Sequence, residues 1–237
     1  MTDATVKSIT VNGDIVGGSS GATSGGIDGG LTSTFQKVTI GGDIESRGTN
    51  IRQGFVRALS IDNILVKGDV IASSGLGSGT RQIDGLNNLG KVVIGGSLIG
   101  NATNRVEIIS DTLTSLLVGR NAEFAEIAVT DSDATLKKLT VNGAWISSRF
   151  AMASDSGADD IFGTNDDPAF AGNATASVAK IIINGQVTGT FGGTDSYLIR
   201  APKIGSLTVA GTKIPFASGE QSFSLSITGD VSATDVA

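Results

Sequence analysis

Hydrophobic and polar residues alternate along this chain in a short phrase that recurs. The first copy, residues 9–15 with the sequence ITVNGDI, has apolar side chains at its first, third and seventh positions and a polar-glycine-polar triplet at positions four to six. This alternation predicts a half-buried strand, and the asparagine and glycine predict a bend after it. Eight further copies begin at residues 38, 64, 92, 116, 139, 181, 207 and 225, and the copy at 116 is degraded.

The spacing of the copies indicates how they associate. Measured at the fifth position, successive steps are 29, 26, 28, 24, 23, 42, 26 and 18 residues, a loose period in the range of solenoids and propellers. An Asn-Gly pair is usually a hairpin signal, so an antiparallel sandwich or barrel is the rival architecture. Turns in such folds recur about every 8 to 12 residues. The longer period here favours successive copies that stack in parallel.

A second strand is visible between the copies, for example in residues 105–110, 125–130 and 196–200. One coil therefore reads as strand, bend, short strand, loop, third strand and turn, which is typical of a parallel β-helix with stacked inward Val, Ile and Leu. We expect an all-β chain that forms one β-solenoid domain, residues 1–237, of about nine coils. Two segments interrupt the period, a Gly/Ser-rich loop at 17–30 and a long loop insertion at about 147–179.

On the strength of these copies, the chain resembles a right-handed parallel β-helix of the pectin-lyase-like type. It resembles more closely the tandem repeats of very large bacterial surface and adhesin-like proteins, and the likeness spans nearly all 237 residues. The resemblance implies a right-handed coil and an extracellular or cell-surface location. It also implies that the chain is a fragment of a longer protein whose signal peptide is not in this fragment.

Composition narrows the classes of partner. With 17 basic and 23 acidic residues the net charge is -6, which makes binding of a nucleic-acid backbone a poor expectation. No run approaches the 18 or more apolar residues of a membrane span, so none is expected. Cysteine is absent, and its absence is compatible with either a reducing cytosol or a bacterial surface protein without disulfides.

One segment inside the long interruption has the composition of a metal site. Residues 155–167, DSGADDIFGTNDD, hold five carboxylates in thirteen residues, and a hard cation with several oxygen ligands would relieve their repulsion. The segment resembles Asp-Gly-x-Phe-Gly-Thr-x-Asp-Asp inserts of bacterial surface repeat proteins, in which calcium binding is the implied role, although Asp160 here replaces the glycine. A solvated acidic loop without an ion is the alternative. The predicted calcium ligands are Asp155, Asp159, Asp166 and Asp167, with Asp160 and Asn165 as weaker candidates.

Candidate catalytic chemistry is sparse. Histidine is absent, which removes histidine-dependent hydrolysis, and adjacent carboxylates in a glycine-rich loop are poorly placed to flank one glycosidic bond. We therefore predict no catalytic residue, and a calcium-dependent polysaccharide lyase remains the enzymatic alternative. The single tryptophan, Trp145, takes the seventh position of its copy, so we expect it in the core. Asn12, Asn142 and Asn184 share the fourth position, where we expect a broken hydrogen-bond ladder.

These observations predict a structural or adhesive repeat segment of an extracellular bacterial surface protein, a rigid spacer stabilised by calcium. The expected partners are further copies of the repeat in the parent chain, or other molecules through end-to-end self-association, with contact to a cell surface or polysaccharide. Two alternatives stay open. One is a polysaccharide-active β-helix, either a lyase or a carbohydrate-binding module, and the other is a self-assembling filament or surface-layer subunit.

Overall fold

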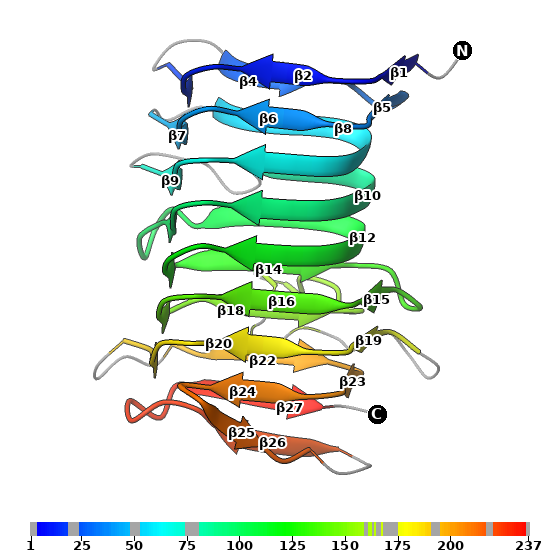
Figure 1. The fold of residues 1–237 in the computed structure, drawn as a ribbon. Helices are drawn as coiled ribbons and strands as arrows, with labels where there is room; N and C mark the ends of the chain where they lie inside the picture. The colour runs from blue at the N-terminus through cyan, green and yellow to red at the C-terminus, as the bar shows by residue number, and fades with distance from the viewer. Residues whose placement is uncertain are drawn as a thin grey trace.

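The chain folds as a right-handed β-solenoid of about seven turns (Figure 1). This computed structural model describes residues 4–18, 24–47, 53–73, 81–158, 161, 162, 164, 167, 175–190, 195–216 and 220–235, and these residues contain strands and no helix. In Figure 1 the front strands run from right to left and the chain returns behind them while it descends, which gives the right-handed sense. The predicted all-β parallel fold is confirmed.

The recurring phrase forms one face of the solenoid, which we call the phrase face. Its strands pair in parallel and in register, so that Leu139 pairs with Ile181 across the long interruption. The first and third residues of the eight copies on this face point inward, because side chains alternate along a strand. The phrase face contains β2 (Ile9–Val11), β6 (Val38–Ile40), β16 (Lys138–Val141), β20 (Ile181–Ile183), β24 (Leu207–Val209) and the second halves of β8 (Gln53–Val66), β10 (Ile83–Ile94) and β12 (Val106–Val118).

After the bend, short strands form a second face. Each carries the seventh residue of a copy inward, and Trp145 is fully buried there, as predicted. Trp145 stacks directly on Ala122 of the degraded copy, and this small residue leaves space for the indole ring. The strands are β3 (Ile15–Val16), β7 (Ile44–Ser46), β9 (Val70–Ala72), β11 (Leu98–Ile99), β13 (Ala122–Glu123), β17 (Trp145–Ile146) and β21 (Val187–Thr188).

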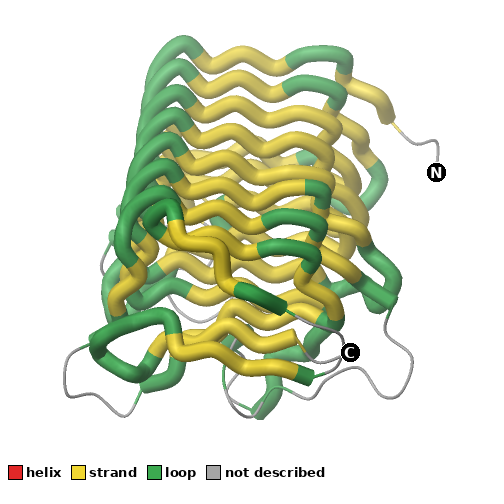
Figure 2. Tube along the Cα trace, turned by 60° about the horizontal axis from the view of Figure 1, so that its bottom comes forward, coloured by secondary structure: helices red, strands yellow, loops and turns green. Residues whose placement is uncertain are grey.

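The third face, which we call the return face, carries the chain back to the next copy. An inward ladder of aliphatic and aromatic residues runs along it, and Ile83, Ile108, Ile127, Phe150 and Ile199 in this ladder are all fully buried. The return face contains β4 (Ser24–Asp28), the first halves of β8, β10 and β12, then β14 (Ala125–Val129), β18 (Arg149–Met152), β22 (Tyr197–Ala201) and β27 (Val231–Asp235). Figure 2 shows the strands of successive coils in line along the stack.

The corner between the return face and the phrase face has two forms. In β8, β10 and β12 a single long strand bends around it, which gives strands of 14, 12 and 13 residues. Elsewhere short corner strands lie between the two faces, namely β1 (Ala4–Val6), β5 (Ser33–Phe35), β15 (Thr135–Leu136), β19 (Ser177–Val178) and β23 (Lys203–Ile204). The predicted loop at residues 17–30 therefore includes β4, and the predicted insertion at residues 147–179 includes β18 and β19. All three strands are part of the stack.

The number of coils is smaller than the nine predicted, because the last two copies change direction. After β24 the residues Ala210 and Gly211 have φ of 47° and 80°, and the chain turns back as β25 (Thr212–Ile214), antiparallel to β24. Two consecutive positive φ values are typical of a tight hairpin turn. The ninth copy joins β26 (Gln221–Ser224) to β27, again as an antiparallel pair. The hairpin interpretation rejected for the whole chain is correct at this end.

Candidate functional site

Phe162, in the long interruption, packs on the outer surface of the return face. The ring of Phe162, 8 % exposed, lies against the outward side chains of Ile109, Ala128 and Ala151 on three neighbouring strands. The two alanines leave a shallow depression in the sheet surface, and a large aromatic side chain fills it. The acidic segment is therefore attached to the solenoid by an apolar contact at Phe162.

Glu126 lies beside this contact, at an outward position of β14. It is 4 % exposed, and the backbone N–H of Phe162 donates to its Oε1 at 3.3 Å. In the sheet it is flanked by Glu107 and Arg149. Burial, together with the charge of Glu107, raises the pKa of Glu126 to about 8, although the Phe162 hydrogen bond and the charges of Arg105 and Arg149 oppose the shift. The carboxyl group is therefore largely protonated at neutral pH.

Two arginines near Glu126 are held by aromatic and backbone contacts. The guanidinium carbons of Arg105 and Arg149 lie 5.5 and 5.1 Å from the ring centroid of Tyr197, which is 1 % exposed. Arg105 Nη1 donates to the carbonyl of Ser147 at 3.0 Å, and Arg149 Nε donates to that of Ser196 at 3.2 Å. Guanidinium groups over an aromatic face are attracted by its negative quadrupole. These contacts bind several coils of the stack to one another.

The structure places two of the six predicted calcium ligands. Asp155 is exposed, and its Oδ1 accepts a hydrogen bond from the Ser156 N–H at 2.9 Å. Asp167 is buried, and its Oδ1 accepts a 2.9 Å hydrogen bond from the Thr164 hydroxyl. Within the described part of the chain, acidic residues do not form a group of three or more that could hold a metal. Those residues alone thus do not complete a site. The other four predicted ligands, Asp159, Asp160, Asn165 and Asp166, lie outside the described residues.

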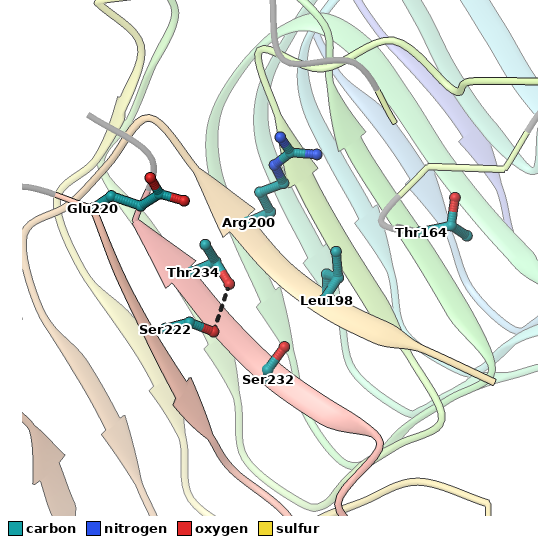
Figure 3. Close-up of a pocket in the computed structure, with 7 residues that line it drawn as sticks. All are labelled: Thr164, Leu198, Arg200, Glu220, Ser222, Ser232 and Thr234. Carbon is teal, nitrogen blue, oxygen red and sulfur yellow. Dashed lines mark hydrogen bonds between the residues drawn. The ribbon is translucent and has the colours of Figure 1, made fainter. Parts of the chain in front are cut away.

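A polar hollow of about 270 Å³ opens beside the docked segment, near the C-terminal end of the return face. Figure 3 shows residues of three neighbouring strands on its floor and Thr164 of the interruption at its side. Arg200 Nη1 donates to the carbonyl of Asp167 at 2.8 Å, which joins the hollow to the acidic segment. The hydroxyls of Ser222 and Thr234 are 3.1 Å apart. The lining residues are Thr164, Leu198, Arg200, Glu220, Ser222, Ser232 and Thr234.

The hollow combines a cation, a carboxylate and several hydroxyls on a shallow surface. This set can donate and accept hydrogen bonds to a polar ligand such as a sugar, and the apolar patch of Leu198 could contact a pyranose face. Sequence reasoning missed this site. Most of its residues come from β22, β26 and β27, and the copies give no signal that the last two strands pair antiparallel. The three hydroxylated residues Ser222, Ser232 and Thr234 on β26 and β27 become a single surface through that pairing.

A second feature missed by sequence reasoning is a column of side chains at the sixth position of the phrase, which we call the bend ladder. Asp14 Oδ1 accepts the backbone N–H of Asp43 at 2.9 Å, and Asp43 Oδ1 accepts that of Asp69 at 2.7 Å. Asp69 Oδ1 accepts from Ser97 at 2.6 Å, and Asn121 Oδ1 accepts from Ala144 at 3.0 Å. Each side chain thus binds the backbone of the next coil.

The glycine at the fifth position makes the bend ladder sterically possible. A Cβ added at Gly42, Gly68, Gly96 or Gly143 would coincide with the ladder oxygen of the preceding coil. The recurring Gly-Asp pair is therefore one device, in which the glycine accommodates the coil before it and the aspartate reaches the coil after it. The predicted asparagine ladder is confirmed for one pair, because Asn184 Nδ2 donates to Asn142 Oδ1 at 3.2 Å.

No protein-family model, curated protein or solved structure matches this chain. No helix among the described residues is long and apolar enough to cross a membrane.

Proposed function

We propose that the chain is a rigid structural segment of an extracellular or cell-surface repeat protein. The observation that supports this role most directly is the continuous stack of eight parallel phrase strands, from β2 to β24, held in one register. About seven turns at a strand spacing of about 4.8 Å give a stack of about 34 Å. The surface location is supported by the resemblance to bacterial surface repeats.

Three kinds of contact stiffen the stack along its axis. Backbone hydrogen bonds of the parallel strands run from coil to coil, inward aliphatic residues form continuous ladders, and the bend ladder adds a charged acceptor at one corner. Interiors packed in this way deform little under load, because packed side chains leave few voids. A spacer needs such stiffness and needs no chemistry at its surface.

Force spectroscopy tests the mechanical role. Handles at Lys7 and Asp235 apply load between the N-terminal edge and the last strand of the stack, and we expect the coils to yield together in one or two sharp events. Gradual extension at low force, one coil at a time, would contradict a rigid spacer. Labelling of intact source cells with antibodies against the chain tests the surface location, and labelling that appears after permeabilisation alone would sink it.

Calcium remains part of the proposal as a stabiliser of the acidic segment, and it rests on the composition of residues 155–167. A melt with millimolar calcium should give a higher Tm than one with EDTA, and the double variant Asp155→Asn, Asp167→Asn should lose the difference. Magnesium is the matched control, because it prefers fewer and more rigidly placed ligands. Equal Tm values in calcium and EDTA, with no ion detected by calorimetry, would leave a solvated acidic loop.

Polysaccharide contact is the second candidate function, and the hollow beside Arg200 is the observation that favours it. If sugars bind there, a glycan array should show saturable binding that Arg200→Ala and Glu220→Ala both abolish. Ser206→Ala, on the corner after β23 and outside the hollow, is the control variant. Release of unsaturated sugar products would extend the function to a lyase. An array without saturable binding would remove the hollow from consideration.

A further inference from the structure

At the N-terminal edge of the solenoid, the backbone N–H groups that would donate to a preceding coil of the bend ladder have no acceptor among the described residues. In six of the seven later coils of the phrase face the backbone N–H at position five donates to a carbonyl of the coil before it, for example Gly42 to Gly13 and Gly68 to Gly42. In five of these coils the N–H at position six donates to the ladder side chain of the coil before it, as in Asp43 to Asp14. Among the described residues, the equivalent N–H groups of Gly13 and Asp14 have no acceptor.

Gly13 has no steric reason, among the described contacts, to be glycine. A Cβ added there would meet nothing within 4 Å, and its φ is outside the left-handed region. At Gly42 and Gly68 the same Cβ would coincide with the carboxylate of the preceding coil. Gly13 therefore keeps a space of the shape that an Asp side chain of a preceding coil would fill.

The apolar interior continues to this edge. Val6, Ile9, Val11 and Ile27 are partly buried against the core, whereas their counterparts one coil later, such as Val38, Ile40 and Val56, are fully buried. An edge of parallel strands with unpaired N–H groups is a template for another strand. The edge is thus the same coil-to-coil interface that recurs throughout the stack, lacking one side.

We propose that this edge binds a further β-coil of the same repeat type, whose bend ends in Gly-Asp and places the aspartate over Gly13 to accept the Asp14 N–H. This inference rests on the proposed structural function, and the partner that it assigns to the N-terminal edge is another coil of the repeat. A second copy of this chain does not supply that aspartate from its opposite end. There the eighth copy has Thr212 at the sixth position, already inside the antiparallel strand β25.

A fusion chain tests the assignment. Val6 pairs with Phe35 and Phe35 pairs with Ile61, so a copy of residues 38–61 joined to Lys7 places an extra coil in register on the edge. Gly13→Ala should leave the Tm of the unfused chain unchanged or slightly raised, because the position is open. In the fusion it should lower the Tm by about 4 °C or more, since it displaces the copied Asp43.

The matched control is a fusion with the copied Asp43 changed to Ala, in which Gly13→Ala should again have little effect. Hydrogen exchange of the Asp14 amide provides a second readout, fast in the unfused chain, slow in the fusion and fast in the control fusion. A fusion that fails to fold cooperatively, or one in which Gly13→Ala is tolerated, would overturn the proposal. Concentration-dependent dimerisation of the unfused chain that protects the Asp14 amide would also overturn it, in favour of a second copy.

The experiment separates this proposal from the proposed function. A chain that extends gradually under force but shows the Gly13 coupling would lose its spacer role and keep its coil-binding edge. A chain that resists force but shows no Gly13 coupling would keep its spacer role and lose its coil-binding edge.

Discussion

The two ends of the solenoid differ in whether their edge strands are covered by other strands. At the C-terminal end, β25 covers the edge strand β24 and β26 covers β27, both in antiparallel orientation. Phe216 and Phe223 meet edge to face with ring centroids 5.0 Å apart, and Phe216 packs on the core with Leu225. At the N-terminal edge the described residues form no such cover. The hairpins close the C-terminal end. The N-terminal edge, where the N–H groups of Gly13 and Asp14 have no acceptor among the described residues, can bind another coil.

The contrast teaches that one phrase can serve two purposes. In the stack its bend directs the chain into the next parallel coil, whereas Ala210-Gly211 and Gly229 at the end take positive φ values and reverse it. Parallel pairing needs a long connection, and antiparallel pairing can be made by a two-residue turn. A local change in backbone conformation therefore converts a repeat into a terminus.

The largest effect should follow removal of the C-terminal cover. Truncation after Val209 deletes β25 to β27 and exposes β22 and β24 as new edges. We expect concentration-dependent association, because uncovered parallel edges pair with other chains. Sedimentation velocity over a range of concentrations measures it, with the intact chain as reference. A truncated chain that stays monomeric would show that the hairpins are dispensable as a cap.

A smaller effect on stability should distinguish the interior of the bend ladder from its N-terminal edge. Gly68→Ala displaces the Asp43 carboxylate from the Asp69 N–H and should lower the free energy of unfolding by about 2 to 3 kcal/mol. Gly13→Ala, at the open edge, is the matched control with an expected change near zero. Urea unfolding of both variants measures the difference. Equal destabilisation at Gly13 and Gly68 would erase the distinction between edge and interior.

Stability should depend on pH in opposite senses through Glu126, in the middle of the stack, and through Asp230, at its closed end. Glu126 has a folded pKa of about 8, above its ordinary value of 4.5, so the folded state holds a proton that the unfolded state releases. Stability should fall as pH rises from about 4.5 to about 8, where both states become ionised. Glu126→Gln should remove this part of the pH dependence in thermal melts between pH 4 and 9. A slope unchanged by the substitution would exclude Glu126 as its source.

The smallest effect should appear at Asp230, in the hairpin of the closed end. Burial favours a higher pKa, but hydrogen bonds from Thr228 and from the backbone and hydroxyl of Thr190 outweigh it, so the pKa is lowered. A depressed folded pKa contributes stability above the unfolded value of 3.8, and this contribution is lost as pH falls through the folded pKa. Asp230→Asn should flatten the acid limb of the melt without changing the alkaline limb. Identical acid limbs would contradict the assignment.

Much of the fold was readable in the copies, because period and alternation are set by one repeated environment. The inward positions from Ile9 to Leu207, the core position of Trp145 and the parallel stacking all follow from it. The reversal after Val209 was not predicted, although the eighth copy keeps apolar residues at its first and third positions and has Lys213 at the seventh, where most copies have an apolar residue. It differs in backbone φ at Ala210 and Gly211, which alternation does not report.

The candidate site was less accessible to sequence reasoning. The acidic residues of the long interruption stood out, but its attachment depends on Phe162 meeting two alanines from coils far away in sequence. The small residues Ala128 and Ala151 at outward positions of β14 and β18 were the available signal, and the alternation of the copies does not single them out. The hollow depends on tertiary pairing of β22 with β27, which no local pattern reports.

The Gly-Asp pair has a consequence for how such a chain changes over generations. The coils that begin at residues 38 and 64 each carry a glycine that accommodates the coil before and an aspartate that binds the coil after. A gene segment that encodes one such coil can therefore be duplicated or deleted without new compensating substitutions. The glycine and the aspartate are adjacent within the same seven-residue phrase, so one duplication copies both. Length variation by whole coils should therefore be tolerated in proteins of this design, whereas shifts of a few residues within the phrase should not.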